Sequence, residues 1–342
     1  MKNFLFGILA VVAHFCLFPL GFTSCDGHIE PEISNNESET GTAITSLSEL
    51  YSALDGLPTN TVSTPHTIVV NLNSFIVIAN ALKSYPDKYV YLDISGSTFT
   101  SIGDYAFSGC TSLISISIGN SVTSIGYDVF YRCINLTSVI IGNGVTGIDN
   151  MTFLSHISLK SISVTIDNPI YSSENGILYN KNKTALLAYP RSKTGNAFTI
   201  PDNVTSIGIG AFSSCWNLYS VTIPDSVTSI GDYAFSSCWN LYNVTIPDGV
   251  TSIGDYAFSN CTSLYSVTIP DSVTSIGIGA FWYCSSLISV NFEGTIPSAG
   301  FSSSAFTGNL YIVYYSTNPS IGTPGWYTTT NQGVYPNWVR QT

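Results

Sequence analysis

The sequence predicts an α/β repeat solenoid, with a curved parallel β-sheet on one side and short helical or 3₁₀ turns on the other. A 23-residue pattern, seen in SIGDYAFSNCTSLYSVTIPDSVT, recurs along most of the chain. Its apolar positions repeat at fixed places, and one such unit is too small to bury its own apolar face. Successive units must therefore stack in register and build one continuous core.

Residues 1–24 are predicted to be a signal peptide. Lys2 supplies a positive charge, and an apolar run over residues 4–20 ends shortly before Cys25. Small residues that lead into a cysteine after such a run resemble a bacterial lipobox, in which Cys25 becomes the lipid-modified first residue of the mature protein. Phe22 departs from that motif, where leucine is commoner. Plain secretion and a retained membrane helix are the alternatives, and the shortness of the run disfavours the helix.

Residues 25–45 are predicted to form an acidic disordered tether, because they lack apolar periodicity. Residues 46–98 are predicted to form a small α+β N-terminal cap, which covers the open end of the first repeat. Helix-like and strand-like spacing alternates in this cap, with helices expected at residues 47–54 and 74–83 and strands at 66–72 and 89–94.

The solenoid itself is predicted to occupy residues 99–309, and three apolar columns define its repeat. The isoleucine column comprises Ile102, Ile125, Ile148, Ile207, Ile230, Ile253 and Ile276. The phenylalanine column comprises Phe107, Phe130, Phe153, Phe212, Phe235, Phe258 and Phe281. The leucine column comprises Leu113, Leu136, Leu159, Leu218, Leu241, Leu264 and Leu287.

The spacing of apolar residues changes within each repeat. Leu218, Val221 and Ile223 end in strict alternation, which predicts a strand with one buried face. The closer spacing of Ile230 and Phe235 suits a short helical or 3₁₀ turn. These two patterns place the sheet on one side of the solenoid and the turns on the other.

One repeat is longer than the others, and the last part of the chain leaves the pattern. The step from Ile148 to Ile207 is 59 residues instead of 23, so this repeat carries a 36-residue insertion, at about residues 166–200. From Ala299 the pattern degrades, and residues 310–342, rich in Tyr, Trp, Gly and Pro, are predicted to form a C-terminal cap.

These repeats resemble the BspA-like, or treponemal-type, leucine-rich repeats, whose pattern is close to SIGxxAFxxCxxLxxVxIPxSVT. The resemblance covers roughly residues 99–295, and it departs from the pattern at Asp149 and His156, where Gly and Cys are expected. It implies a leucine-rich-repeat solenoid and a hairpin in the insertion. It also implies a surface or secreted protein, since some members of the family are adhesins, but it implies no particular ligand.

The cysteines after Cys25 all occupy one column of the repeat: Cys110, Cys133, Cys215, Cys238, Cys261 and Cys284. Neighbouring rungs lie about 5 Å apart with parallel side-chain directions. A disulfide needs Cβ atoms that converge. We therefore expect a buried ladder of free thiols, with disulfides and metal binding as the alternatives.

Composition and motifs argue against several functions. The formal net charge of −11 repels nucleic acid and anionic lipid, so membrane contact is expected only through the lipid anchor. The GxSxG and HExxH signatures of catalysis are missing. We expect no enzyme activity, no cofactor and no metal. A column of aspartates is expected to hydrogen-bond its own turns rather than bind calcium: Asp202, Asp225, Asp248 and Asp271.

Aligned aromatic residues are the first candidate for a binding site. The column after the repeat leucine carries Tyr219, Tyr242 and Tyr265, and a second column carries Trp216 and Trp239, with Trp282 expected close by. Uncharged Ser, Asn and Thr residues occupy the neighbouring strand positions. Aromatic faces beside hydroxyl and amide groups suit sugars or protein side chains. The alternative is that these rings only cover the rim of the sheet.

Basic residues in the insertion are the second candidate: Lys181, Lys183, Arg191 and Lys193. Residues 201–300 contain no Lys or Arg at all. A basic hairpin on an acidic solenoid could bind an acidic partner. Alternatively, its charges only prevent edge-to-edge pairing of strands.

The sequence therefore predicts an exported, non-catalytic lipoprotein of the outer membrane or cell surface that recognises an extracellular protein or glycan. A secreted form is the alternative location. The alternative function is structural, as a self-associating component of the cell surface or matrix without a specific soluble ligand.

Overall fold

The computed structural model describes residues 42–154, 157–330 and 336–341, which fall in one compact unit of the chain. The predicted signal peptide, the lipidation candidate Cys25 and most of the predicted tether lie outside the described residues. Within the described part, no helix has the length and apolar character needed to cross a membrane.

The N-terminal cap has the predicted elements in the predicted order. Helix α1 (Leu47–Gly56) begins at Ser46, whose hydroxyl accepts from the Glu49 backbone N–H, while the Glu49 carboxylate accepts from the Ser46 backbone N–H. This capping box satisfies two donors that a helix start otherwise leaves free. The remaining elements are β1 (His66–Val69), α2 (Phe75–Ser84) and β2 (Val90–Ile94).

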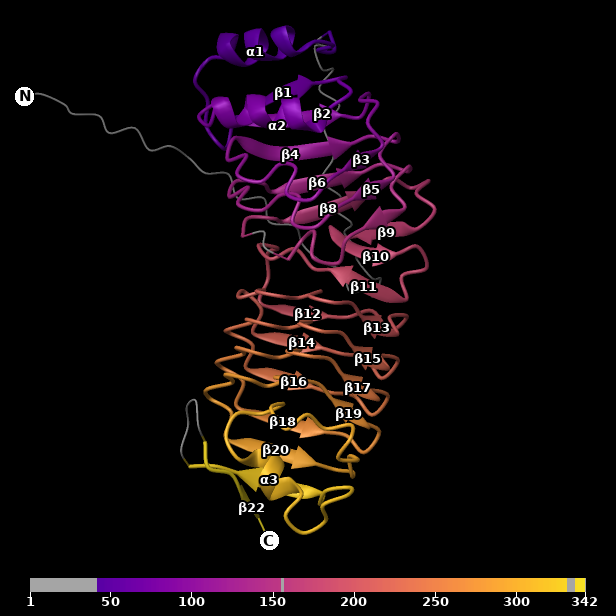
Figure 1. Cartoon of the computed structure of the whole chain (residues 1–342), viewed down its shortest axis with the longest axis vertical. Helices are drawn as coiled ribbons and strands as arrows, with labels where there is room; N and C mark the ends of the chain where they lie inside the picture. The colour runs from indigo at the N-terminus through magenta and orange to yellow at the C-terminus, as the bar shows by residue number, and fades with distance from the viewer. Residues whose placement is uncertain (1–41, 155–156, 331–335, 342) are drawn as a thin grey trace, which may run out of the picture. The chain divides into compact units, whose positions relative to one another are not determined.

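Parallel strands run along one side of the repeats, as predicted, and they form three successive sheets (Figure 1). The first sheet continues from β1 and β2 through β4 (Leu113–Ile118), β6 (Ser138–Ile141) and β8 (Ser161–Val164). The second sheet holds β12 (Ala197–Thr199), β14 (Ser220–Thr222) and β16 (Asn243–Thr245), and the third begins with β18 (Ser266–Ile269) and β20 (Ser289–Phe292). Val221 pairs with Val244, one repeat later, so equivalent residues lie side by side along the sheet.

The opposite side has two-residue strands and hydrogen-bonded turns where helical or 3₁₀ turns were expected. Each short strand is the Ser-Ile or Gly-Ile pair of one repeat: β3 (Ser101–Ile102), β5 (Ser124–Ile125), β7 (Gly147–Ile148), β13 (Ser206–Ile207), β15 (Ser229–Ile230), β17 (Ser252–Ile253) and β19 (Ser275–Ile276). In the turn that follows β15, Tyr233 and Ser237 have φ angles of 56° and 60°. A left-handed residue cannot continue a right-handed helix, so each turn closes without becoming one.

The core consists of identical side chains stacked from rung to rung. Phe212, Phe235, Phe258 and Phe281 are buried, and consecutive ring centroids lie 4.9, 5.0 and 5.1 Å apart with interplanar angles of 7° or less. The expected stacking of Phe on Phe is confirmed. Because all rings share one orientation, each rung presents the next with a surface of the same shape.

The six column cysteines are free and buried, as expected. The Cys238 thiol donates to the Phe212 carbonyl, with 3.0 Å between sulfur and oxygen, and Cys261 and Cys284 repeat this contact at 3.2 and 3.1 Å. Cys133 donates to Phe107 in the same way, whereas the thiols of Cys110 and Cys215 donate to the carbonyls of Ala79 and Tyr189, so every thiol links its rung to the backbone before it.

The insertion consists of a hairpin and a divergent repeat. Strands β9 (Tyr171–Glu174) and β10 (Ile177–Asn180) form an antiparallel hairpin, and β11 (Ala185–Ala188) pairs antiparallel with β10 and parallel with β13. Leu186 pairs with Ile207, and the Tyr189 ring stacks on Phe212 at 5.2 Å. Counted from Leu186 to the residue before Ile207, the divergent repeat has 21 residues with other side chains, and the other 15 of the 36 extra residues account for the hairpin.

The middle strand of the insertion lies between two parts of the core. Ile177 and Tyr179 pack into the apolar cluster that continues to the C-terminal end. Leu178, between them in sequence, packs into the cluster that begins in the N-terminal cap. Alternating side chains of a strand point to opposite faces, so β10 contributes to both clusters.

The C-terminal cap ends the parallel sheet by changing direction. Strand β21 (Gly325–Thr328) pairs antiparallel with β20, and β22 (Val339–Arg340) pairs antiparallel with β21. Helix α3 (Leu310–Tyr314) places Tyr314 in the core, where its hydroxyl accepts from the Ile296 backbone N–H at 3.0 Å. The aromatic residues of the tail therefore cover the last rung.

Candidate functional site

Three tyrosines form a stacked and exposed column at the start of the later sheet strands. Tyr219, Tyr242 and Tyr265 directly precede β14, β16 and β18. Their ring centroids lie 5.4 and 6.2 Å apart, with interplanar angles of 7° and 20°. The rings nevertheless stay 51%, 45% and 43% exposed. Backbone pairing fixes this arrangement, because the Tyr242 N–H donates to the Tyr219 carbonyl at 3.0 Å.

Two tryptophans form a second column three residues earlier in the repeat. The Trp216 and Trp239 centroids lie 6.0 Å apart at an angle of 51°, and Trp239 is 47% exposed. The side-chain amide of Asn240 donates to the Trp216 carbonyl at 2.7 Å, which ties the two rungs together at this point. We call Trp216, Trp239 and the three tyrosines Tyr219, Tyr242 and Tyr265 the aromatic edge.

Trp282 is not part of this edge, and its predicted place beside the other tryptophans is wrong. It directly follows the repeat phenylalanine, whereas Trp216 and Trp239 directly follow the repeat cysteine. Its ring contacts Tyr256 at 6.2 Å and Tyr283 at 4.4 Å. Tyr256 in turn stacks on Tyr233 at 5.2 Å, which makes a second aromatic group that the sequence reasoning missed. The recurrence of Tyr in the DYAF segments was the available signal.

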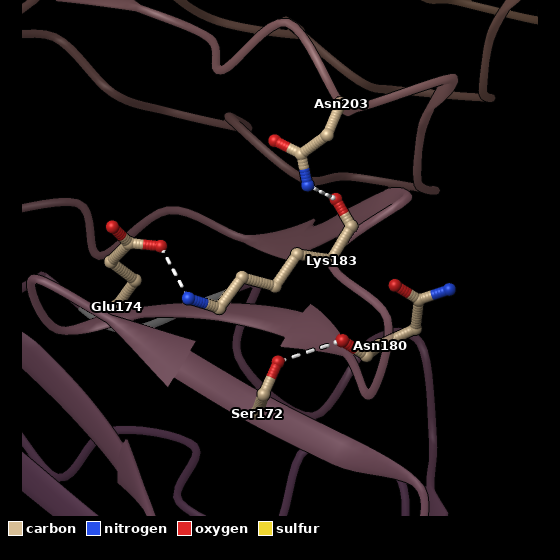
Figure 2. Close-up of polar contacts among 5 residues, drawn as sticks. All are labelled: Ser172, Glu174, Asn180, Lys183 and Asn203. Carbon is tan, nitrogen blue, oxygen red and sulfur yellow. Dashed lines mark hydrogen bonds and ion pairs between the residues drawn. The ribbon is translucent and has the colours of Figure 1, made fainter.

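The four basic residues of the insertion divide into two places. Lys181 and Lys183 lie in the turn between β10 and β11, and the Lys183 ammonium forms an ion pair with Glu174 at 2.6 Å (Figure 2). The Lys181 ammonium donates to the Ile166 carbonyl at 2.9 Å. Asn203 donates to the Lys183 carbonyl at 2.8 Å, so this turn is also attached to the following repeat (Figure 2). Both ammonium groups therefore have partners within the chain.

Arg191 and Lys193 belong to the divergent repeat, and only Arg191 lies on the aromatic edge. The Arg191 guanidinium carbon lies 4.1 Å from the centroid of the Trp216 ring, which is a cation–π contact. Burial lowers the pKa of Arg191 from its ordinary value, and its Nε is buried without a hydrogen-bond partner. The Lys193 ammonium donates to the Asn175 carbonyl. Only Arg191 of the four therefore contacts a predicted aromatic site residue.

The column of aspartates differs from its expected role. The turns after the strands are closed by proline carbonyls, and the Val227 N–H donates to the Pro224 carbonyl at 3.0 Å. Among the described residues, none of the four carboxylates accepts a hydrogen bond, and all are exposed: Asp202, Asp225, Asp248 and Asp271. Over the same described residues, no group of three or more metal-ligating side chains is found.

The stacked 23-residue repeats and their buried columns define the class of the protein, a leucine-rich-repeat solenoid. The family described as BspA type leucine rich repeat region matches in six copies over residues 87–194 and 188–312. The chain belongs to this family. The resemblance expected from the SIGxxAF and cysteine columns is thereby confirmed.

Solved structures give similar proteins of bacterial origin. A leucine-rich repeat protein from Eubacterium ventriosum is 27% identical over 67% of this chain and 72% of that chain, with a TM-score of 0.46. A leucine rich cell surface protein from Faecalibacterium prausnitzii is 28% identical over 66% of this chain and 64% of that chain, with a TM-score of 0.48. The pneumococcal vaccine antigen PcpA is 17% identical over 74% of this chain and 77% of that chain, with a TM-score of 0.50. This likeness supports the fold alone. No curated protein matches the chain.

Proposed function

We propose that the protein is an exported, non-catalytic recognition protein that binds an extracellular protein or glycan through the aromatic edge. The observation that carries this proposal is the exposure of the tyrosine column. Tyr219, Tyr242 and Tyr265 are between 43% and 51% exposed although they stack on one another. Buried core aromatics of the same repeats are at most 1% exposed.

A ligand would meet rings that are already ordered. Tyrosine loses few side-chain rotations on binding, and stacking with backbone pairing already holds these rings in place. Asn243 directly follows Tyr242, and Thr222 ends the strand that Tyr219 precedes; both are exposed and supply an amide and a hydroxyl on these strands. Such a combination offers apolar contact together with hydrogen bonds of either direction.

The non-catalytic role is supported by the chemistry of the cysteines, the most nucleophilic side chains in the repeats. Burial raises the pKa of Cys238 and Cys284 to about 12. A thiol with such a pKa stays protonated at neutral pH and is a poor nucleophile. Export and a lipid anchor at Cys25 are part of the proposal, and they are supported by the apolar segment that leads into this cysteine.

The test is a binding screen of the protein without its signal segment against glycans and extracellular-matrix proteins. Replacing Tyr219, Tyr242 and Tyr265 by Ala together should weaken binding of the ligand found by at least about tenfold, since exposed aromatic contacts dominate many interfaces. A matched control replaces three tyrosines of the opposite turns, Tyr105, Tyr233 and Tyr256, and should leave the affinity unchanged. Equal losses in both variants, or a screen that finds only self-association, would refute recognition by the aromatic edge.

A further inference from the structure

A groove of about 740 Å³ lies at the N-terminal part of the sheet, apart from the aromatic edge. Its rim is the loop that carries Asn60, Thr61, Val62 and Ser63 between α1 and β1. Its floor includes Tyr91 on β2, and further residues at or before the starts of β4, β6 and β8. A groove of this size is in the range of small-molecule sites.

The rim loop is attached to the sheet before any ligand arrives. The Asn60 side-chain amide donates to the Tyr89 carbonyl at 2.7 Å, and its oxygen accepts from the Tyr89 N–H at 3.0 Å. The Lys88 ammonium donates to the Leu57 carbonyl at 2.5 Å. The Thr61 hydroxyl lies 2.9 Å from the hydroxyls of both Ser63 and Thr64. The loop therefore presents an ordered group of hydroxyls.

Charge in the groove is opposite to the charge of the chain. The chain has 21 acidic and 10 basic residues, yet no Asp or Glu lines the groove, and Lys160 is its one charged lining residue. Lys160 is exposed, and within the described part of the chain its ammonium forms no ion pair or hydrogen bond. The lysines at positions 88, 181, 183 and 193 all have such partners.

The groove continues past Lys160 into a smaller hollow. This hollow has a volume of about 230 Å³ and shares Val62, Thr137 and Lys160 with the groove. It adds Asn135, Ser158 and Ser192, which are again an amide and two hydroxyls. Lys160 therefore stands between two connected hollows, both lined by hydroxyl and amide groups.

We propose that this groove binds an acidic oligosaccharide, with the Lys160 ammonium on a sugar carboxylate and the Tyr91 ring against a sugar face. Hydroxyl oxygens on both sides of Lys160 can accept from the hydroxyls of flanking sugar units. The exposed Tyr91 ring, at 43%, supplies the apolar surface that a sugar ring needs. An acidic peptide is the weaker fit, because most residues that line the groove carry hydroxyl or amide groups and few offer apolar contact to peptide side chains.

The experiment is calorimetric titration of the protein without its signal segment, using disaccharides that contain a uronic acid and neutral disaccharides of the same linkage, such as cellobiuronic acid and cellobiose. We expect at least one acidic member to bind about tenfold more tightly than its neutral counterpart, because a charge-assisted hydrogen bond distinguishes them. Lys160→Met should abolish this preference. Lys83→Met, which removes the same charge from an exposed position of helix α2 outside the groove, should preserve it.

Two further variants separate this site from the aromatic edge. Tyr91→Ala should weaken the acidic and the neutral sugar alike, and replacement of the three edge tyrosines should change neither. The inference is overturned if no acidic disaccharide binds or if Lys160→Met binds like wild type. It is also overturned if Lys83→Met loses as much of the preference for the acidic sugar as Lys160→Met does. Hexaglutamate that binds in the Lys160-dependent way with higher affinity than every sugar would also overturn it, in favour of an acidic protein ligand.

Discussion

Four of the repeat cysteines have a structural role that alanine or serine would not fill equally well: Cys133, Cys238, Cys261 and Cys284. Their thiols donate to the carbonyl of the phenylalanine one rung earlier, as the 3.0 Å contact of Cys238 with Phe212 shows. That same carbonyl also accepts from the Cys215 backbone N–H at 3.1 Å. Alanine would remove the thiol's hydrogen bond to the carbonyl oxygen. Serine would restore a donor, but the free-energy cost of burying a hydroxyl is higher than that of burying a thiol.

The buried thiols should make the protein sensitive to alkaline pH. Burial raises the pKa of Cys238 to about 12. In the unfolded chain a thiol ionises at about pH 8.5. The unfolded state therefore loses protons first, so the thiol's contribution to stability is complete below about pH 8.5 and is lost as pH rises toward 12. Denaturant titrations at pH 7, 9 and 10 measure the effect.

A cysteine variant separates this effect from the titration of tyrosines and lysines. Cys238→Ala should be less stable than wild type at pH 7, but its free energy of unfolding should fall less steeply above pH 9. The expected difference in slope is about 1.4 kcal/mol per pH unit for one thiol. Parallel curves for the two proteins would show that Cys238 does not titrate differently in the folded state.

Phe235 should be among the most costly side chains to truncate. It is fully buried and stacks on Phe212 and Phe258 at 4.9 and 5.0 Å. Phe235→Ala should lower the free energy of unfolding by roughly 3–5 kcal/mol, because the rigid rungs on both sides prevent the cavity from closing. Tyr233→Ala, at a 37% exposed position of the same repeat, should cost much less. A loss below about 1 kcal/mol for Phe235→Ala would contradict its place in the core.

Among the structural elements, the insertion shows which repeats the sequence pattern could predict and which it could not. The columns of Ile, Phe and Cys predicted the regular repeats, but they are replaced by Leu186, Tyr189 and Ser192 in the divergent repeat. Leu186 and Tyr189 still fill the core. Because they differ from the Ile and Phe of the other repeats, however, the sequence pattern shows only a long gap at this repeat. The misplacement of Trp282 has a similar cause, because a shift of three residues within a turn moves a side chain to another column.

The turn between β10 and β11 should matter for local order and not for ligand binding. Lys183 pairs with Glu174, and both side chains are partly exposed, at 39% and 47%. Exposed ion pairs contribute little, so replacing Lys181 and Lys183 together by Glu should lower the free energy of unfolding by about 1 kcal/mol or less. Affinity for the ligand of the aromatic edge should stay unchanged.

Arg191 provides the comparison within the same insertion. Because its guanidinium lies on Trp216, Arg191→Glu should weaken that ligand's binding where the double lysine variant does not. The measurement is titration of both variants against one ligand, at low and at high salt. If the double lysine variant no longer binds the ligand and Arg191→Glu binds it with wild-type affinity, the ligand contacts the hairpin and not the aromatic edge.

In the whole molecule, the features that follow from the repeats were predicted from the sequence. The stacking register, the parallel sheet and the need for caps all follow from apolar columns that a single repeat cannot bury. The groove at Lys160 could not be predicted, because it joins a non-repetitive loop near Asn60 to the first repeats. Side chains far apart in sequence meet there only after the cap has packed against the sheet.

The proposed lipid anchor at Cys25 would account for membrane attachment of an acidic protein. With a formal net charge of −11, the chain has no electrostatic attraction to anionic lipid, so a covalent anchor is the remaining means of membrane attachment in our proposal. Cys25→Ala should move the protein from the membrane fraction to the soluble fraction of fractionated cells. Cys16→Ala, inside the predicted signal peptide, should leave the distribution unchanged. If the Cys25 variant remains in the membrane fraction after its signal peptide has been removed, some other part of the protein holds it there and the lipid anchor is disproved.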